Sequence, residues 1–187
     1  MHEKVAEEFT EKLAEKMGAM KIGRGVDEGV EVGPLIDATQ RDKVAELVDD
    51  ATGKGASVVV GGAAGDGPGY FYEPTVLGGV SEDARLLKEE IFGPVAPVIG
   101  FSDEEQAVAA ANDTEFGLVS YVYTSDVKRA FRVCEGLETG MIGLNQGLVS
   151  NPAAPFGGVK ASGFGREGGA EGIHEYLEIK YVAMAMD

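Results

Sequence analysis

The sequence has one cysteine and no long run of apolar residues. A lone thiol, Cys134, cannot close an internal disulfide, and without neighbouring ligands it does not make a zinc site, so we expect no bound metal. The longest apolar stretch runs from Gly93 to Phe101, far short of the roughly 20 residues of a membrane helix, and the start lacks an apolar signal core. We therefore expect no membrane partner and a cytoplasmic location.

Basic residues are also scarce. Sixteen Lys and Arg residues stand against 32 Asp and Glu residues, which gives a net charge of −16. Such a field repels phosphate backbones unless a local basic patch overrides it, and the sequence contains no such patch. We therefore expect no nucleic-acid partner.

The 187 residues are 44% apolar and 26% charged, a globular composition with the length of one domain and one core. Apolar spacing and turn residues predict helices over residues 2–17, 38–54, 103–112 and 126–135, and strands over residues 57–60, 75–77, 94–101, 119–123 and 141–144. Because helices and strands alternate, the predicted fold is α/β, a three-layer αβα domain with a mainly parallel sheet.

The C-terminal third has a different character. Residues 145–172 are rich in Gly, Pro, Ser and Ala without a lasting period, which indicates a long ordered loop or a site. Residues 174–184 alternate apolar and charged side chains, which predicts a terminal strand. This strand either closes the sheet or pairs with another chain.

Few residues have obvious chemistry. His2 stands at the start and His174 beside the terminal strand, and we interpret both as structural or solvent-facing. Cys134 falls on the apolar face of its helix with no evident activator, so we interpret it as a small core group. No Ser-His-Asp or Cys-His arrangement is apparent.

Four motifs nevertheless resemble signature segments of the aldehyde dehydrogenase superfamily, in matching order. They are Gly33 to Ile36 (GPLI), Lys88 to Val95 (KEEIFGPV), Ala111 to Leu118 (ANDTEFGL) and Pro155 to Glu167 (PFGGVKASGFGRE). The resemblance implies the fold of that family's C-terminal catalytic region. It assigns residues 1–172 to a partial catalytic domain and residues 173–187 to an oligomerisation strand that makes a homo-oligomer.

In the family, the nucleophilic cysteine, the general-base glutamate and the dinucleotide-binding domain precede the region that these motifs cover. The resemblance therefore implies that the chain carries no catalytic residue and is inactive alone. A rival from another class is a non-catalytic assembly module that joins other subunits through its terminal strand.

The resemblance places Glu90 and Phe92 at the cofactor, NAD or NADP. In an extended segment, residues two apart project on the same side, so a carboxylate for the ribose hydroxyls and a ring for the nicotinamide would lie together. Without the family, a helix-end acid and a core Phe would explain the pair. Glu89 has no such match and is expected to be solvated.

The resemblance also places Ser150 and Phe156 at the substrate. The string from Gly147 to Gly158 is similar to the succinate-semialdehyde branch of the family, in which the hydroxyl matching Ser150 helps to hold the remote carboxylate of an aldehyde substrate. Phe156 would line the substrate tunnel. Ser150 could instead cap the turn before Asn151, and Phe156 could instead anchor its loop.

The last motif also contains glycines and charges. We expect its glycines, at positions 157, 158, 163 and 165, to serve positive φ angles or close chain contacts. Lys160, Arg166 and Glu167 suit either an anion site or a structural ion pair, and we favour the ion pair.

Overall fold

Each long helix in the first part of the chain begins at a side-chain cap. Helix α1 (Glu3–Gly18) follows His2, whose Nδ1 accepts a hydrogen bond from the Lys4 amide at 3.2 Å. Helix α2 (Ala38–Gly53) follows Asp37, whose carboxylate accepts from the Gln40 amide at 2.8 Å. These caps satisfy amides that have no partner within the helix, and they fix where each helix starts.

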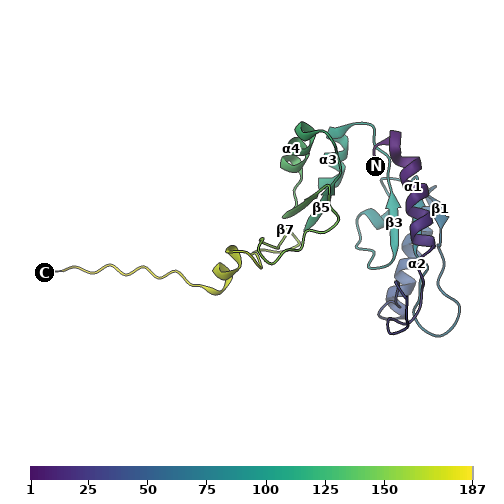
Figure 1. Cartoon of the computed structure of the whole chain (residues 1–187), viewed down its shortest axis with the longest axis horizontal. Helices are drawn as coiled ribbons and strands as arrows, with labels where there is room; N and C mark the ends of the chain where they lie inside the picture. Colours follow the sequence, from purple (N-terminus) through teal and green to yellow (C-terminus); the bar gives the residue numbers. More distant parts are fainter. Residues whose placement is uncertain (187) are drawn as a thin grey trace. The chain divides into compact units, whose positions relative to one another are not determined.

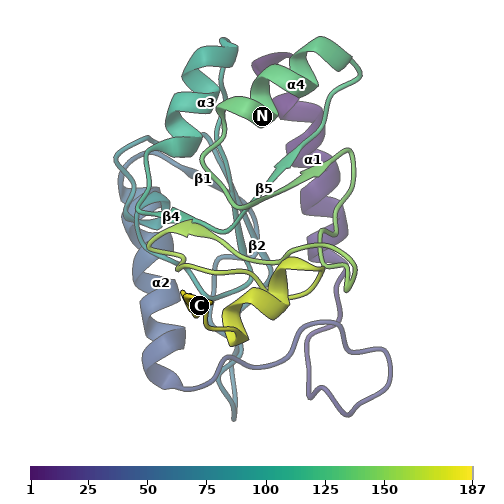
Figure 2. The same ribbon diagram turned by 90° about the vertical axis from the view of Figure 1, so that its left-hand side faces the viewer.

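The computed structural model describes residues 1–186, and their contacts divide the chain into two units, Met1–Asp103 and the residues from Glu104 onward. The first unit contains a three-stranded mixed sheet. Strand β1 (Ser57–Val60) pairs antiparallel with β2 (Thr75–Gly78), and β2 pairs parallel with β3 (Val95–Val98). Helices α1 and α2 lie on opposite sides of this sheet (Figure 2).

The core of the first unit lies mainly between α2 and the sheet. Val44, Leu47 and Ala51 of α2 are completely buried and belong to one cluster with Leu77 of β2. Tyr72 is buried in the same cluster, and its hydroxyl donates to the carbonyl of Gly62 at 3.2 Å. Burial, reinforced by the charges of two nearby carboxylates, raises the pKa of Tyr72 to about 12. A short 3₁₀ helix, η1 (Arg85–Leu87), closes this core.

The second unit begins with two helices that share an ion-pair network. Helix α3 (Glu104–Asn112) presents Glu104 to Arg129 and Arg132 of α4 (Val127–Gly136), at 3.0 Å in each case. The Asp126 carboxylate accepts from two amides of the first turn of α4 and so caps this helix. Figure 1 shows both helices beside the strands of this unit.

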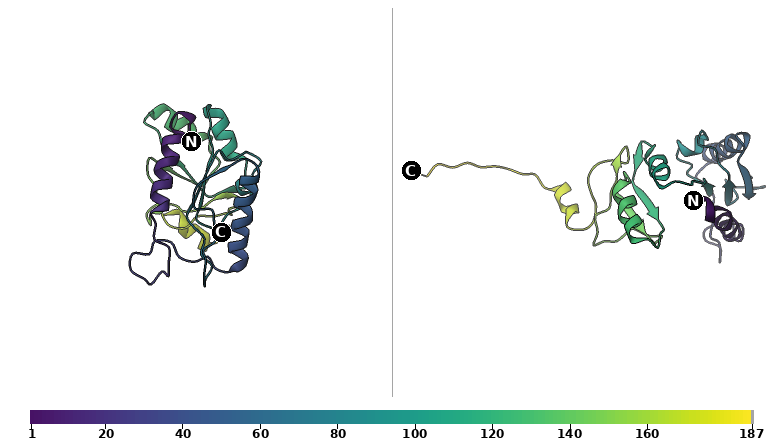
Figure 3. Two further views of the ribbon diagram at one scale, coloured as in Figure 1. Left: turned by 90° about the vertical axis from the view of Figure 1, so that its right-hand side faces the viewer. Right: turned by 90° about the horizontal axis from the view of Figure 1, so that it is seen from above.

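Two small sheets complete the second unit. Strands β5 (Val119–Val122) and β6 (Met141–Leu144) pair in parallel, whereas β4 (Phe116–Gly117) and β7 (Val159–Lys160) pair antiparallel. A 3₁₀ helix, η2 (Glu171–Tyr176), follows, and residues 177–186 form no helix or strand (Figure 3).

The α/β class and the expected helices and strands up to residue 144 are confirmed. The strands form three small sheets with mixed pairing, in which β1–β2 and β4–β7 are antiparallel and β2–β3 and β5–β6 are parallel. The chain divides into two units, and the core cluster of the described residues lies in the first of them. The expected division into a domain of residues 1–172 and a terminal strand stays a prediction. Within residues 1–186 the expected terminal strand is not formed, because residues 174–176 belong to η2 and residues 177–186 have no strand partner. Its pairing with another chain stays a prediction.

Candidate functional site

The segment Glu90–Phe92 lies between η1 and β3 and is held from α2 by side-chain donors. Gln40 Nε2 donates to the carbonyl oxygens of Ile91 and Phe92, at 2.9 and 3.2 Å. Lys43 Nζ donates to the carbonyl oxygen of Glu90 at 2.8 Å. Three successive carbonyl groups are therefore fixed, while Glu90 is exposed and the Phe92 side chain is 69% exposed.

The conformation of this segment differs from the expected extended one. Phe92 has a φ of 50°, in the left-handed region, and residues 90–92 belong to no strand. The argument that alternate residues project on one side is therefore wrong here, because it holds only for extended backbone. The alternative of a core Phe is also wrong, since the ring is largely exposed. The cofactor roles of Glu90 and Phe92 stay a prediction.

Glu89 has an arginine partner, so the expectation that its side chain is simply solvated is wrong. Its carboxylate pairs with the guanidinium of Arg85, with a distance of 2.8 Å from Nε to Oε1. The hydrogen bond from Arg85 lowers the pKa of the Glu89 carboxyl. The Glu89 carboxylate is thus paired with an arginine four positions earlier in the chain. The adjacent Glu90 is exposed.

The loop after β6 is organised by asparagines. Asn145, at a φ of 54°, binds both the amide and the carbonyl of Thr124 through its side chain, each at 2.9 Å. Asn151 Oδ1 accepts from the Ala153 amide at 2.9 Å, so Asn151 rather than Ser150 caps the turn there. Ser150 is exposed, and its role at the substrate stays a prediction.

Phe156 lines an open groove of about 790 Å³ in the second unit. Its backbone amide and carbonyl both pair with Glu167, at 2.7 Å each, which supports the idea that Phe156 anchors its loop. The groove is lined also by Leu118, Phe164 and Tyr176, but Ser150 is not among its lining residues. Ser150 therefore does not share this groove with Phe156.

The glycines of the last motif have both expected roles. Gly163 and Gly165 have φ angles of 102° and 81°, which disfavour any side chain. A Cβ on Gly157 would lie 2.5 Å from the carbonyl oxygen of Gly165, and one on Gly158 would lie 2.6 Å from Ser162 Cβ. These glycines allow close approach of the chain and shape the groove.

The charges of this motif are structural, with partners other than those expected. Lys160 pairs with Glu138 at 2.6 Å and donates to the carbonyl of Asn112 at 2.9 Å. Arg166 Nη1 donates to the carbonyls of Gly158 and Gly165, at 2.7 and 2.6 Å. Backbone carbonyl oxygens thus accept hydrogen bonds from both cations. Glu167 pairs with Phe156 through its backbone.

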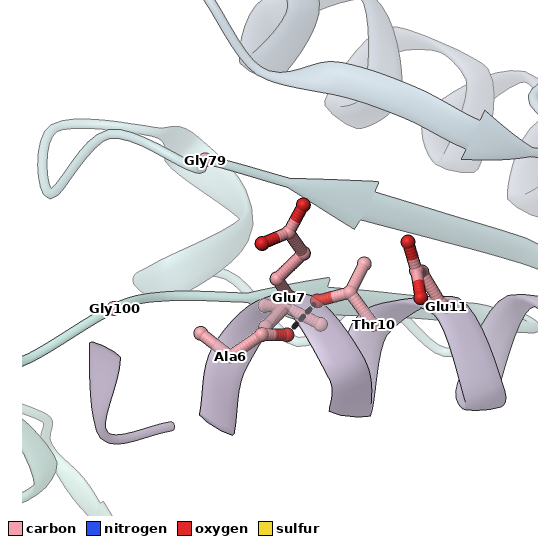
Figure 4. Close-up of a pocket in the computed structure, with 7 residues that line it drawn as sticks. Ala6, Glu7, Thr10, Glu11, Gly79 and Gly100 are labelled. Carbon is pink, nitrogen blue, oxygen red and sulfur yellow. Dashed lines mark hydrogen bonds between the residues drawn. The ribbon is translucent and has the colours of Figure 1, made fainter. Parts of the chain in front are cut away.

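A second pocket, of about 330 Å³, lies along α1 (Figure 4). Its polar groups are Glu7, Glu11 and Thr10, whose hydroxyl donates to the carbonyl of Ala6 at 2.6 Å. Neither Glu90 nor Phe92 lines it, so it does not belong to the candidate cofactor site.

Other sources of chemistry can be assessed in the part of the chain that the structure describes. Within residues 1–186, no group of three or more His, Cys, Asp or Glu side chains is placed to hold a metal ion. None of the helices in that range combines the length and the apolar character needed to cross a bilayer.

His2 is structural, because it caps α1 and its ring meets the Phe101 ring edge-on, 5.6 Å between centroids. Cys134 is half-buried on α4.

Sequence reasoning did not find Gln40 and Lys43. Their hydrogen bonds join residues 47 to 52 positions apart, and both side chains are of types that usually cover the exposed side of a helix. No local pattern marks such long-range donors, so only the folded structure identifies them.

Comparisons with known proteins agree with the motifs and the fold. The model of the aldehyde dehydrogenase family matches residues 1–182, and the chain belongs to this family. A succinate-semialdehyde dehydrogenase of Paenarthrobacter nicotinovorans is 54% identical over 99% of this chain and 41% of its own length. A glutarate-semialdehyde dehydrogenase of Pseudomonas putida is 52% identical over 97% of this chain and 38% of its own length.

Solved structures give the same result. The crystal structure of a succinate-semialdehyde dehydrogenase from Burkholderia pseudomallei superposes with a TM-score of 0.95 at 50% identity, over 99% of this chain and 38% of that one. The aldehyde dehydrogenase fold expected from the motifs is therefore confirmed. The chain spans about two fifths of the length of the relatives that it matches.

Proposed function

We propose that this chain acts as part of an NAD(P)-dependent aldehyde dehydrogenase that oxidises succinate semialdehyde to succinate. The observation that carries the proposal is the 54% identity, over 99% of the chain, to a protein named succinate-semialdehyde dehydrogenase. In the overall reaction, the aldehyde carbon loses a hydride to NAD(P)⁺, water supplies the second carboxylate oxygen, and two protons are released.

Two residues of the chain suit the reactive end of the cofactor, NAD or NADP. The exposed Glu90 carboxylate can accept hydrogen bonds from two vicinal ribose hydroxyls, and the exposed Phe92 ring offers a flat surface to the nicotinamide. Both side chains are open to a ligand while their backbone is fixed, which supports the assignment. The cofactor, when bound, supplies the hydride acceptor.

We expect the isolated chain to be inactive. The family reaction begins with attack of a cysteine thiolate on the aldehyde, and the only cysteine here, Cys134, is half-buried on α4. The chain therefore contributes the cofactor contacts and part of the substrate tunnel. The single cysteine, which cannot form an internal disulfide, favours a cytoplasmic location.

Glutarate semialdehyde is the second candidate substrate. It is one methylene longer and carries the same remote carboxylate, and the Pseudomonas putida relative with that name is nearly as similar to this chain. One methylene changes binding by about 1–3 kcal/mol, so the ratio of kcat/KM values for the two aldehydes distinguishes them.

The experiment uses a chimera in which this chain replaces the matched part of the Paenarthrobacter nicotinovorans enzyme. We expect Ser150→Ala to lower kcat/KM for succinate semialdehyde by ~10- to 150-fold, because it removes one hydrogen bond to a charged group. Butanal has no carboxylate, so its kcat/KM should change little. Equal losses for both aldehydes would overturn the substrate role of Ser150, and a folded chimera that reduces no cofactor would overturn the proposed function.

The terminal segment supports a homo-oligomer. Residues 173–186 carry large apolar side chains that the described part of the chain leaves exposed, including Ile179 at 100% and Tyr181 at 88% exposure. Exposed apolar side chains on an unpaired segment favour pairing with another chain. The same segment would serve a non-catalytic assembly module, and inactivity of every chimera together with stable self-association would favour that alternative.

A further inference from the structure

The donors from α2 to the segment Glu90–Phe92 stand close together on one side of the helix. Gln40 and Lys43 are three positions apart, so they share a helix face, and the neighbouring Val44 is completely buried in the core. The helix is thus anchored by its apolar side while its polar edge reaches the segment. A donor held on a packed helix fixes its acceptor better than one on a loop.

The segment needs such support because its own conformation is unfavourable. Phe92 adopts a left-handed φ of 50°, which is unfavourable for a residue with a Cβ because the Cβ comes close to the backbone. Next to it, Gly93 lies so near α2 that a Cβ would come within 2.6 Å of Val44 Cγ2. External hydrogen bonds and this close packing therefore offset the strain and keep one conformation.

We propose that Gln40 and Lys43 are positioning residues, which hold the Glu90 carboxylate and the Phe92 ring in the orientation that the cofactor requires. This inference rests on the proposed function. Gln40 fixes two carbonyl groups with one amide, and Lys43 adds a charged donor at the preceding carbonyl. Because hydride transfer depends steeply on geometry, loosening the segment should slow this step and leave aldehyde binding unchanged.

The first measurement uses the 187-residue chain itself. The sequence contains no tryptophan, so Phe92→Trp introduces a single fluorophore into the segment. In that background, we expect Gln40→Met and Lys43→Met to lower the residual fluorescence anisotropy of the tryptophan. The matched control is Arg41→Met, because the Arg41 guanidinium pairs with Asp42 at 2.8 Å rather than with the carbonyl groups of the segment. Unchanged anisotropy in both variants would overturn the proposal.

The second measurement uses the chimera with Phe92 restored. We expect Gln40→Met and Lys43→Met to slow single-turnover hydride transfer by ~10-fold or more, with KM for the aldehyde within ~2-fold of the unmodified value. Lys43→Arg keeps a charged donor and should restore most of the rate. Arg41→Met should leave it unchanged.

A second variant guards against loss of folding. Gln40→Glu keeps the shape of the side chain but sets a carboxylate against two carbonyl oxygens, so it should reproduce the effect of Gln40→Met in a folded protein. Normal hydride transfer in these variants of an active chimera would overturn the positioning role alone. A folded chimera that is inactive without any of these substitutions would overturn the proposed function, and this inference with it.

Discussion

The two units of the chain bury their apolar side chains to different extents. The first has a continuous core of α2, β2 and the segments around them, with twelve of the fourteen buried apolar residues of the described chain. The second contributes only Ala130 and Met141, and on α4 both Val127 and Phe131 are 67% exposed. The first unit is thus stabilised by its own core, whereas the second presents apolar surface of the kind that other protein surfaces cover.

The largest effect on stability should come from two side-chain truncations, one on α2 and one on α4. Leu47→Ala in the first unit removes a side chain with 0% exposure and should lower the free energy of unfolding by about 2–5 kcal/mol. Phe131→Ala on α4 should change it by less than about 1 kcal/mol, because that ring is largely exposed. Urea unfolding of both variants measures the contrast. Equal losses would show that the second unit has a core as demanding as the first.

The exposed terminal segment offers a second way to sharpen the comparison. If residues 173–187 pair with another chain, truncation after Gly172 should shift the light-scattering mass towards the monomer, since the pairing segment is lost. Substituting Val127 and Phe131 by serine, with the terminal segment intact, is the control for general apolar association. An unaltered oligomer after truncation, or a monomeric starting chain, argues against the prediction.

A smaller effect is expected at the buried tyrosine of the first unit. The pKa of Tyr72 is raised from 10.0 to about 12, so the folded state keeps the proton in a range where the unfolded state releases it. The contribution of the buried, protonated Tyr72 to the free energy of unfolding is complete below about pH 10 and is lost as the pH rises towards about 12. The urea midpoint should fall across this range in the unmodified chain and much less in Tyr72→Phe. A midpoint with equal pH dependence in both proteins would contradict the burial of this hydroxyl.

The smallest effect should come from the ion pairs of the second unit. The hydrogen bond from Arg132 lowers the pKa of Glu104, so any stabilisation is present at neutral pH and is lost as the pH falls below about 4.5. Because both arginines are exposed and Glu104 is only partly buried, Glu104→Gln should lower the urea midpoint only slightly, and added salt should remove the difference. A large, salt-insensitive loss would mean that the pairs between α3 and α4 replace a core.

The sequence determined the helices and strands up to residue 144 except the short elements η1 and β4, since apolar spacing and caps such as Asp126 act locally. Four motifs were enough to place the chain in its family, and the glycines at positions 157, 158, 163 and 165 had the conformational roles expected of them.

Only the tertiary structure decided how distant segments meet. The antiparallel pairing of β1, the left-handed turn at Phe92 and the donors Gln40 and Lys43 all depend on contacts between residues far apart in the sequence. The terminal segment shows that a pattern suited to a strand forms no strand without a distant partner. The pattern of residues 174–184 predicts a strand, but a strand exists only when another backbone supplies its hydrogen bonds, and no segment within residues 1–186 does so.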